Sequence, residues 1–385
     1  MSTTRMSKIS ASGTLRQGEL VNRMKQKGID VICFTLGEPD FDTPKNVVNT
    51  CIKALKAGET HYTPSAGKYE LKKAVSGKLV KENRVPSTPD NIIISPTKHL
   101  IYMSLMAILE EGDEVIIPSP AWPSYKSQVL LTGGNPIFVE GIGEKGFSLD
   151  LGGMERAVTT RTKAIILCNP SNPTGNMATK KELERLAKIC KDEDILVISD
   201  EVYERLVYRG NHVSIGSLPE MAERTITVGG LSKSHAMTGW RAGWLSGPEE
   251  TVRDITKIQQ HTVTCTPEFI QDAMLEALVG PKEEVNSLVK QFKSRRDLMV
   301  KLMSKVDGLT IDSVPQGAFY LFPRFTVDMT SWDLAEKILK EGHVGVTAGD
   351  AFGPGGSGRL RFSYATGTER IKEGMKRVAK VFDRL

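Results

Sequence analysis

The chain has 385 residues, which is enough for two domains and a large buried core. Lysine and arginine total 51 against 46 aspartates and glutamates, so the net charge is +5. These charges are spread along the chain, and no basic block indicates a nucleic-acid partner. The longest apolar stretch, at 100–109, is too short to cross a bilayer. We therefore expect a globular protein without a membrane anchor or nucleic-acid partner.

Cysteine and histidine usage indicates a reducing compartment and no metal. The five cysteines are widely separated and include no C-x-x-C pair, which argues against a disulfide framework and a structural zinc site. The six histidines form no H-E-x-x-H motif, and no carboxylate constellation indicates a metal ligand set. The pattern is typical of a cytoplasmic protein without a metal centre.

Short apolar runs alternate with amphipathic segments through the first two thirds of the chain. The runs lie at 91–95, 113–118, 163–168, 194–200, 225–230 and 242–247. Between them, residues 102–111 and 180–193 have helical spacing. This alternation predicts an α/β fold in which a mostly parallel sheet is sandwiched by helices.

The last part of the chain has a different pattern. Residues 282–306 indicate one long helix. Shorter apolar runs follow at 317–323 and 359–365, and residues 331–341 between them have helical spacing. We expect a second, smaller α+β domain that begins near residue 285.

Reactive side chains follow several of the predicted strands. In sheets of this kind, ligands bind beyond the carboxyl ends of the strands. The segments at those positions read "SPTKH", "PSPAWPSY", "NPSNPTG", "SDEVY" and "GLSKSH". The last of them contains Lys233, and Arg241 follows it eight residues later, with Gly230, Gly239 and Gly243 around the pair. We expect the glycines to let the chain turn closely around both side chains.

A lysine amine in such a segment can form a Schiff base with an aldehyde. Desolvation and nearby cations both favour the neutral amine that this reaction needs. The chemistry predicts an acid, an aromatic face and a phosphate cradle elsewhere in the site. All three residue types occur at the predicted strand ends.

These segments carry a family resemblance. "GLSKSHAMTGWRAG" resembles the pyridoxal-phosphate attachment motif of class I aminotransferases, the aspartate aminotransferase group of the fold type I enzymes, and "NPSNPTG" and "SDEVY" resemble two further signatures. The similarity extends from about residue 35 to 365. It implies pyridoxal 5'-phosphate as cofactor, and a homodimer with shared active sites. The implied parts are an N-terminal segment (1–44) that packs with the small domain and the partner subunit, a large cofactor-binding domain (45–284) and a small domain (285–385).

The resemblance implies roles around the cofactor ring. Lys233 resembles the lysine that binds the cofactor's aldehyde and then moves a proton as base and acid in turn. Asp200 resembles the acid that keeps the pyridine nitrogen protonated, and Tyr203 resembles the phenol that bonds the ring oxygen. Asn172 resembles the amide partner of that oxygen, and Trp122 the aromatic stacked on the ring.

Other residues resemble the phosphate contacts of the family. Thr97 and Lys98 follow a predicted strand and begin a helix, so their backbone N–H groups would face an anion. Arg241 resembles the arginine that binds the phosphate with both arms of its guanidinium, and Ser232 adds a hydroxyl. Tyr62 resembles the tyrosine that reaches the phosphate of the neighbouring subunit.

Substrate contacts are implied in the smaller domain and near the N-terminus. Arg361 resembles the arginine that grips the α-carboxylate, although Arg359 is only two residues away, and Gly37 resembles a backbone contact to the same group. Trp122 and Asn172 also face the substrate in this assignment. Because arginine and cofactor would lie on different domains, substrate would favour domain closure.

Three residues resemble the side-chain pocket of one aspartate aminotransferase subgroup: Lys98, Ser12 and Thr14. A partly dry cation prefers a dicarboxylate, so aspartate with 2-oxoglutarate is the first expectation, through a ping-pong reaction. An aromatic or broad-specificity aminotransferase is the alternative, with Lys98 as a solvated helix-start residue. A lyase on the same cofactor also stays open, because stabilising a carbanion does not fix where it is protonated.

Overall fold

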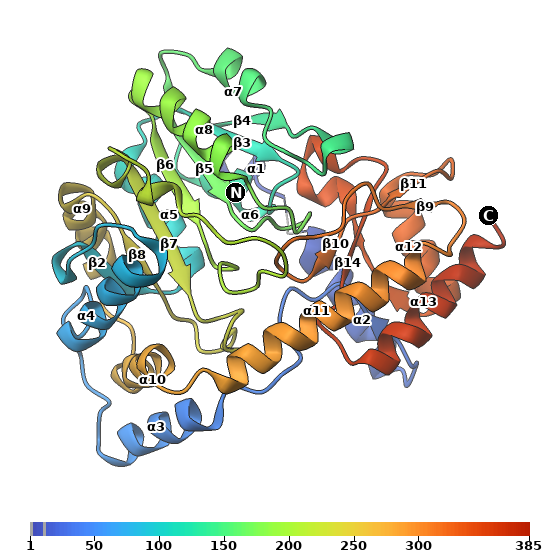
Figure 1. The fold of residues 1–385 in the computed structure, drawn as a ribbon, viewed down its shortest axis with the longest axis horizontal. Helices are drawn as coiled ribbons and strands as arrows, with labels where there is room; N and C mark the ends of the chain where they lie inside the picture. The colour runs from blue at the N-terminus through green and yellow to red at the C-terminus, as the bar shows by residue number, and fades with distance from the viewer. Residues whose placement is uncertain (1–2, 11–12) are drawn as a thin grey trace.

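The structure is a computed structural model that describes residues 3–10 and 13–385. A seven-stranded sheet lies at the centre of the larger part of the molecule (Figure 1), in the order β2-β8-β7-β6-β5-β3-β4. β8 is antiparallel to both of its neighbours, and the other neighbouring pairs are parallel. The strands are β2 (Ile92–Ser95), β3 (Glu114–Ser119), β4 (Asn135–Glu140), β5 (Thr162–Cys168), β6 (Leu196–Asp200), β7 (Thr225–Gly230) and β8 (Gly243–Ser246). The mostly parallel sheet predicted from the sequence is confirmed.

Alternate side chains of the central strands enter two separate cores. Ile166 and Ile198 pack on one face, against α5 (Thr97–Ile108), α6 (Ser124–Leu131) and α9 (Glu249–Gln260). Ile165 and Val197 pack on the opposite face, against α7 (Leu151–Ala157) and α8 (Lys180–Asp192). This period of two explains why the strands read as continuous apolar runs, since both faces of the sheet are buried.

A third core covers the β2 edge of the sheet. Val75, Ile92, Ile94 and Trp244 belong to it. Its helices are α3 (Lys45–Lys56), α4 (Tyr69–Lys78) and α10 (Glu268–Val279). Short 3₁₀ and π segments complete the connections: η1 (Leu79–Asn83), η2 (Pro89–Asn91), η3 (Gly143–Lys145), η4 (Ile215–Ser217), η5 (Ala222–Arg224), η6 (Gly349–Phe352) and η7 (Pro354–Gly356).

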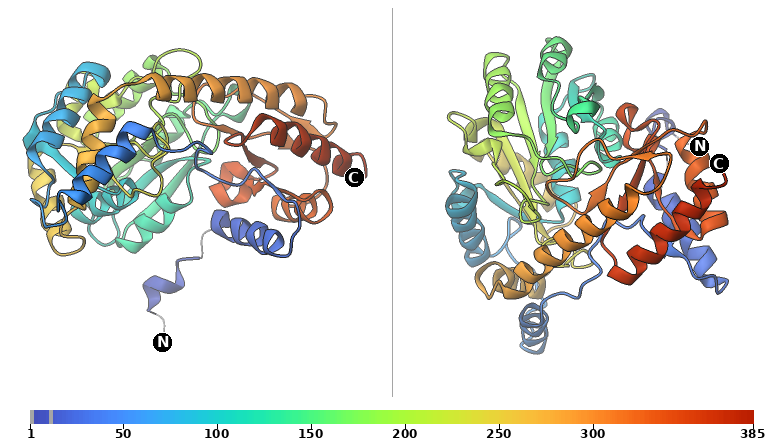
Figure 2. Two further views of the ribbon diagram at one scale, coloured as in Figure 1. Left: turned by 90° about the horizontal axis from the view of Figure 1, so that it is seen from below. Right: turned by 45° about the vertical axis from the view of Figure 1, so that its right-hand side comes forward.

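The C-terminal part has its own core and small sheets. Helix α11 (Glu283–Met303) leads into it from the sheet-containing part, as Figure 2 shows. The remaining helices are α1 (Thr4–Ser7), α2 (Gly13–Gln26), α12 (Ser331–Gly342) and α13 (Thr368–Phe382). The strands are β1 (Ile32–Cys33), β9 (Leu309–Thr310), β10 (Tyr320–Leu321), β11 (Arg324–Phe325), β12 (Val344–Gly345), β13 (Thr347–Ala348) and β14 (Leu360–Ser363). Because β1 pairs with β12, the N-terminal segment is attached to this part of the molecule.

Two features bear on the sequence expectations. Strand β4 was not among the predicted runs; it lies at the sheet edge, is mostly half-buried and contains Pro136. Within the described residues, no helix is long and apolar enough to cross a membrane.

Candidate active site

A cavity of about 490 Å³ lies at the carboxyl ends of the central strands and is also lined by the C-terminal part. Residues singled out from the sequence make up much of its wall: Gly37, Thr97, Lys98, Trp122, Asn172, Asp200, Tyr203, Ser232, Lys233, Arg241 and Arg361. These residues are far apart in the chain: Thr97 and Lys98 begin α5, Asp200 ends β6 and Arg361 lies in β14. The sheet brings Thr97, Asp200 and Lys233 together, because its parallel strands end at one common edge. Arg361 reaches the cavity from the C-terminal part, where β14 pairs with β10 and β13.

Lys233 lies three residues after the end of β7 and lines the cavity. Its Nζ donates a hydrogen bond to the carbonyl oxygen of Gly37 at 2.6 Å. Burial lowers the pKa of Lys233 to about 8, although the charges of Glu38 and Asp200 oppose this shift. A larger fraction of the amine is therefore neutral and nucleophilic near neutral pH than for a surface lysine.

Asp200 ends β6 and is a buried carboxylate. Tyr125 Oη donates to its Oδ2 at 2.6 Å, and the backbone N–H of Val202 donates to Oδ1 at 3.3 Å. Burial raises the pKa of Asp200, and the hydrogen bond from Tyr125 opposes that rise. Tyr125 was not predicted from the sequence, although it lies three residues after Trp122 in the strand-end segment "PAWPSY".

Tyr203 lies in the turn after β6, and its hydroxyl is 2.8 Å from that of Tyr320. The Oδ1 of Asn172 accepts a hydrogen bond from Arg361 Nη1 at 2.9 Å. Tyr320 also lies under the Arg361 guanidinium, 4.4 Å from the ring centroid. Tyr320 was not predicted from the sequence, because only the packing of β10 against β14 brings it to the site.

Arg361 and Arg359 have different environments. Arg361 lines the cavity, and its buried Nε has no hydrogen-bond partner among the residues that the structure describes. Arg359 is not among the cavity-lining residues; its Nη2 lies 2.6 Å from Asp312 Oδ2, and its Nη1 donates to the carbonyl of Phe322. An incompletely paired, buried guanidinium is a binding group for a carboxylate.

The other end of the cavity is cationic. Thr97 and Lys98 form the first turn of α5, and Arg241 and Ser232 lie in the same wall. Lys98 Nζ lies 4.7 Å from the centroid of the Trp122 ring. Burial lowers the pKa of Lys98, and the charge of Arg241 lowers it further. A helix N-terminus beside two cationic side chains is a binding site for an anion.

Two of the three surrounding glycines are sterically required. A Cβ at Gly230 would lie 2.8 Å from Thr97 Oγ1, and one at Gly243 would lie 2.3 Å from the same atom. A Cβ at Gly239 would have no atom of the described chain within 4 Å, so the expectation of a close approach there is wrong. Gly230 and Gly243 thus bring β7 and β8 close to the start of α5.

The structure does not place three of the expected residues in this wall. Tyr62 is 86% exposed and is not among the cavity-lining residues. Ser12 lies outside the described residues. Thr14 belongs to α2, but its side chain lies outside the described part of the chain.

The cavity therefore combines an amine of lowered pKa, a buried carboxylate and an anion-binding end, which together make a candidate active site. Comparison with known proteins gives its class. The family described as "Aminotransferase class I and II" matches residues 29–378. The chain belongs to this family, and it is an aminotransferase.

Individual relatives cover nearly the whole chain. It is 41% identical to a probable aspartate/prephenate aminotransferase of Aquifex aeolicus, over 99% of this chain and 98% of that protein. It is also 41% identical to aromatic-amino-acid aminotransferase 2 of Thermococcus litoralis, over 92% of each chain. Among solved structures, the aspartate aminotransferase from Thermus thermophilus with maleate is 35% identical, with a TM-score of 0.94 over 99% of both chains.

Proposed function

We propose that the chain is a pyridoxal 5'-phosphate-dependent aminotransferase that moves the amino group of L-aspartate to 2-oxoglutarate by a ping-pong mechanism. The observation that carries the proposal is the position of Lys233, whose lowered pKa makes its amine reactive between a buried acid and a cationic helix start.

The donor set fits the three functional groups of this cofactor. The Lys233 amine suits an aldehyde, and Asp200 suits a protonated pyridine nitrogen. The first turn of α5 with Arg241 and Ser232 suits a phosphate. When bound, the cofactor supplies an acceptor for the electron pair that stays behind when the α-proton leaves.

The protein groups bind the substrate and move its proton. Arg361 would bind the α-carboxylate through its guanidinium, which Asn172 and the carbonyl of Thr35 hold in place at 2.9 and 2.7 Å. Lys233 Nζ would accept the α-proton and later return a proton as the acid. Trp122 and Tyr125 occupy the wall beside Asp200, where they exclude water from the reacting centre.

Lys98 supports a dicarboxylate substrate. Its ammonium has a lowered pKa and lies against Trp122 inside the cavity, so a second carboxylate would compensate a partly desolvated charge. The Thermus thermophilus neighbour was solved with maleate, itself a dicarboxylate. The aromatic relative, at equal identity to this chain, makes aromatic amino acids the competing substrate class.

The assembly and the location are also proposals. We infer a homodimer in which Tyr62 of one subunit reaches the phosphate end of the other site. Its side chain is 86% exposed, and the apolar Ile52 and Leu55 of the preceding helix α3 are exposed as well. Residues 45–284 and 285–385 would form a large and a small domain that close around substrate. All five cysteines are free, which supports a reducing cytoplasm.

An absorbance spectrum of the cofactor-loaded protein tests the function. Added L-aspartate, without any oxo acid, should convert the aldehyde form of the cofactor into its amine form. 2-Oxoglutarate should then restore the first spectrum. A cofactor band that phenylalanine converts and aspartate does not would replace the dicarboxylate proposal with the aromatic one. No cofactor band at all would overturn the proposed function.

A further inference from the structure

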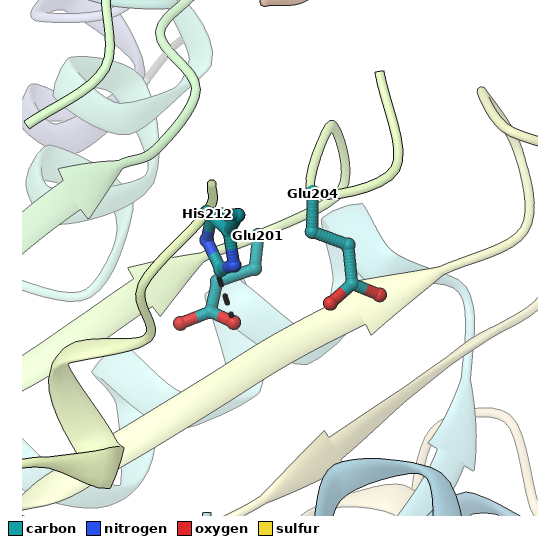
Figure 3. A group of neighbouring side chains, drawn as sticks. All are labelled: Glu201, Glu204 and His212. Carbon is teal, nitrogen blue, oxygen red and sulfur yellow. Dashed lines mark ion pairs between the residues drawn. The ribbon is translucent and has the colours of Figure 1, made fainter. Parts of the chain in front are cut away.

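Five polar side chains form a buried group behind the cavity, which we call the anchor cluster: Lys78, Asn83, Glu201, Glu204 and His212. Figure 3 shows the two carboxylates and the imidazole lying together. Exposed fractions are 5% for the Lys78 side chain, 2% for that of Glu201 and 11% for that of Glu204. Nothing in the sequence indicates this cluster, because its members are spread over more than 130 positions of the chain.

The carboxylates of the anchor cluster are densely hydrogen-bonded. Glu201 Oε1 accepts from the hydroxyls of Ser199 and Ser214 at 2.9 and 2.5 Å. Asn83 Nδ2 bridges the two acids, at 3.1 Å from Glu201 Oε2 and 2.5 Å from Glu204 Oε2. The Lys78 ammonium donates to the other oxygen of Glu204. Each carboxylate oxygen of the pair therefore already has a protein donor.

The charge balance argues against a metal ion as occupant. Glu201, Glu204 and His212 offer ligand atoms within 4.8 Å of one another, and the buried His212 Nε2 has no hydrogen-bond partner within the described residues. The Lys78 ammonium, however, already neutralises Glu204. Burial raises the pKa of Glu204, but the charges of Lys78 and His212 outweigh it, and the pKa is lowered overall. A divalent cation would have to displace Lys78 from Glu204, and every carboxylate oxygen of the two acids already has a protein donor.

The anchor cluster lies on one face of the turn whose other face forms the active site. Asp200 and Tyr203 line the cavity, whereas Glu201 and Glu204 belong to the cluster. Each pair is three residues apart, and the Glu204 N–H donates to the Glu201 carbonyl at 2.9 Å, which fixes the turn between them. A rotation of this turn that disturbed one face would also disturb the other.

Two buried acids and a buried lysine add little net stability to a fold, because each charge loses its hydration. Replacing a buried ion pair with apolar side chains of similar volume is often neutral for stability or favourable. Directional hydrogen bonds instead hold the groups that they join in one defined orientation. Here Lys78 ends α4 and Asn83 ends η1, so both donors come from the third core rather than from the turn itself.

We propose that the anchor cluster positions Asp200 and Tyr203, with Lys78 as its principal positioning residue. Lys78 is not among the cavity-lining residues, and it acts through Glu204 and the turn. This inference rests on the proposed function, since Asp200 and Tyr203 are its cofactor contacts.

The test compares four full-length proteins: wild type, Lys78→Met, Glu204→Gln and the double variant that carries both changes. The dissociation constant of pyridoxal phosphate, kcat and KM for aspartate, and the Tm are measured for each. Lys78→Met should lower the Tm, weaken cofactor binding about tenfold and lower kcat at least tenfold, with a smaller change in KM. The same measurements apply to Glu204→Gln, which leaves the buried Lys78 ammonium with its hydrogen bond to Asn83 at 2.6 Å and the more distant, half-exposed Glu82 at 3.9 Å.

The double variant separates positioning from stability. It removes both charges and keeps the side-chain volumes, so its Tm should return close to that of wild type. Cofactor affinity and kcat should stay low, because the bond from Lys78 to Glu204 in the turn is gone. Recovery of the Tm, the cofactor affinity and kcat in the double variant would overturn the proposal, because the cluster would then contribute only to stability. A soluble double variant also keeps the test decisive where Lys78→Met fails to fold.

Glu114→Gln provides a matched control. Glu114 is also a buried carboxylate, bonded to Arg161 and Thr159, but it begins β3 at the opposite end of the sheet from the cavity. This variant should have a lower Tm and unchanged cofactor affinity and kcat. If Glu114→Gln lowers both as much as Lys78→Met does, the effect of Lys78 is general destabilisation and the proposal fails.

Three further outcomes are distinguishable. Micromolar zinc that raises the Tm of wild type, but not of His212→Ala, would make the cluster a metal site and overturn the positioning role. Wild-type protein that binds no pyridoxal phosphate would overturn the proposed function itself. Normal wild-type binding and turnover with an unaffected Lys78→Met variant would overturn only this inference.

Discussion

The two faces of the turn after β6 differ in how completely their acids are paired. Glu201 accepts hydrogen bonds from Ser199, Ser214 and Asn83, at 2.5 to 3.1 Å. Asp200, the preceding residue, accepts one side-chain bond, from Tyr125, and a longer one at 3.3 Å from a backbone N–H. Both carboxylates are buried. A carboxylate offers about four acceptor sites, so Asp200 retains capacity for a ligand that Glu201 has largely used within the protein.

The two enclosed lysines repeat this contrast. Lys78 Nζ pairs with the negative charge of Glu204, whereas Lys233 Nζ donates to the neutral carbonyl of Gly37. Burial lowers the pKa of Lys233 to about 8. Burial alone does not mark a reactive group in this molecule, since both amines are enclosed. The lack of a directly bonded carboxylate distinguishes Lys233 from Lys78.

Replacing Lys233 with alanine should produce the largest effect. Turnover should fall by about 10³-fold or more, because the variant lacks the group that moves the α-proton. Binding of pyridoxal phosphate through its phosphate should persist, which a fluorescence titration measures. Borohydride reduction followed by mass spectrometry shows which of the two lysines carries the cofactor. Wild type and Lys78→Met should both retain the cofactor's mass, and Lys233→Ala should not. Cofactor attached to Lys78 would contradict the contrast between the two lysines.

Asp200→Asn and Glu201→Gln should have opposite effects: the first should mainly lower kcat, and the second should mainly lower the Tm. Asp200→Asn should lower kcat about 100-fold, since the pyridine nitrogen loses its carboxylate, while the Tm changes little. Glu201→Gln should lower the Tm more and kcat less, because its bonds are internal to the protein. Thermal unfolding and steady-state rates measured on both variants decide this. A larger loss of kcat in Glu201→Gln than in Asp200→Asn would show that the partly paired acid is not the functional one.

The sequence predicts much of this arrangement because the sheet is buried on both faces. Each central strand is a continuous apolar run, so its end, and the residue after it, can be located within a few positions. Asp200 and Lys233 lie at or just after such ends, and parallel strands bring them to one edge. The mostly half-buried edge strand β4 was not predicted.

Contacts that depend on packing between distant elements could not be predicted. Tyr125 reaches Asp200 from α6, and Tyr320 reaches Tyr203 from the C-terminal part. Lys78 and Asn83, in the segment "KLVKEN" at 78–83, were not singled out from the sequence, yet both are buried. A charge pattern in one segment does not reveal an acid 126 residues away that pairs with it.

Lys98→Ala tests the substrate assignment at the cationic end. It should reduce kcat/KM for aspartate by about tenfold or more, because an unpaired distal carboxylate costs roughly 1–3 kcal/mol. Phenylalanine should lose much less, since its ring needs no cation. Steady-state rates with both amino acids measure the ratio. Equal losses of kcat/KM for the two amino acids would mean that Lys98 only supports the cofactor. An aromatic substrate would then be favoured over aspartate.

Tyr125→Phe should produce the smallest and most specific change, a loss of about three- to tenfold in kcat/KM at neutral pH from one hydrogen bond. Burial raises the pKa of Asp200, and the Tyr125 bond holds it down, so removing the hydroxyl should raise that pKa further. Because the ionised carboxylate is the active form, activity should disappear at a higher pH on acidification and approach wild type on the alkaline side. Tyr208→Phe is the matched control, since its buried hydroxyl bonds the carbonyl of Ala318 rather than Asp200. An equal loss at every pH in Tyr125→Phe would mean that Tyr125 orients the site without tuning the acid. The upward shift of the acid limb, absent in the control, is what an incompletely paired Asp200 requires.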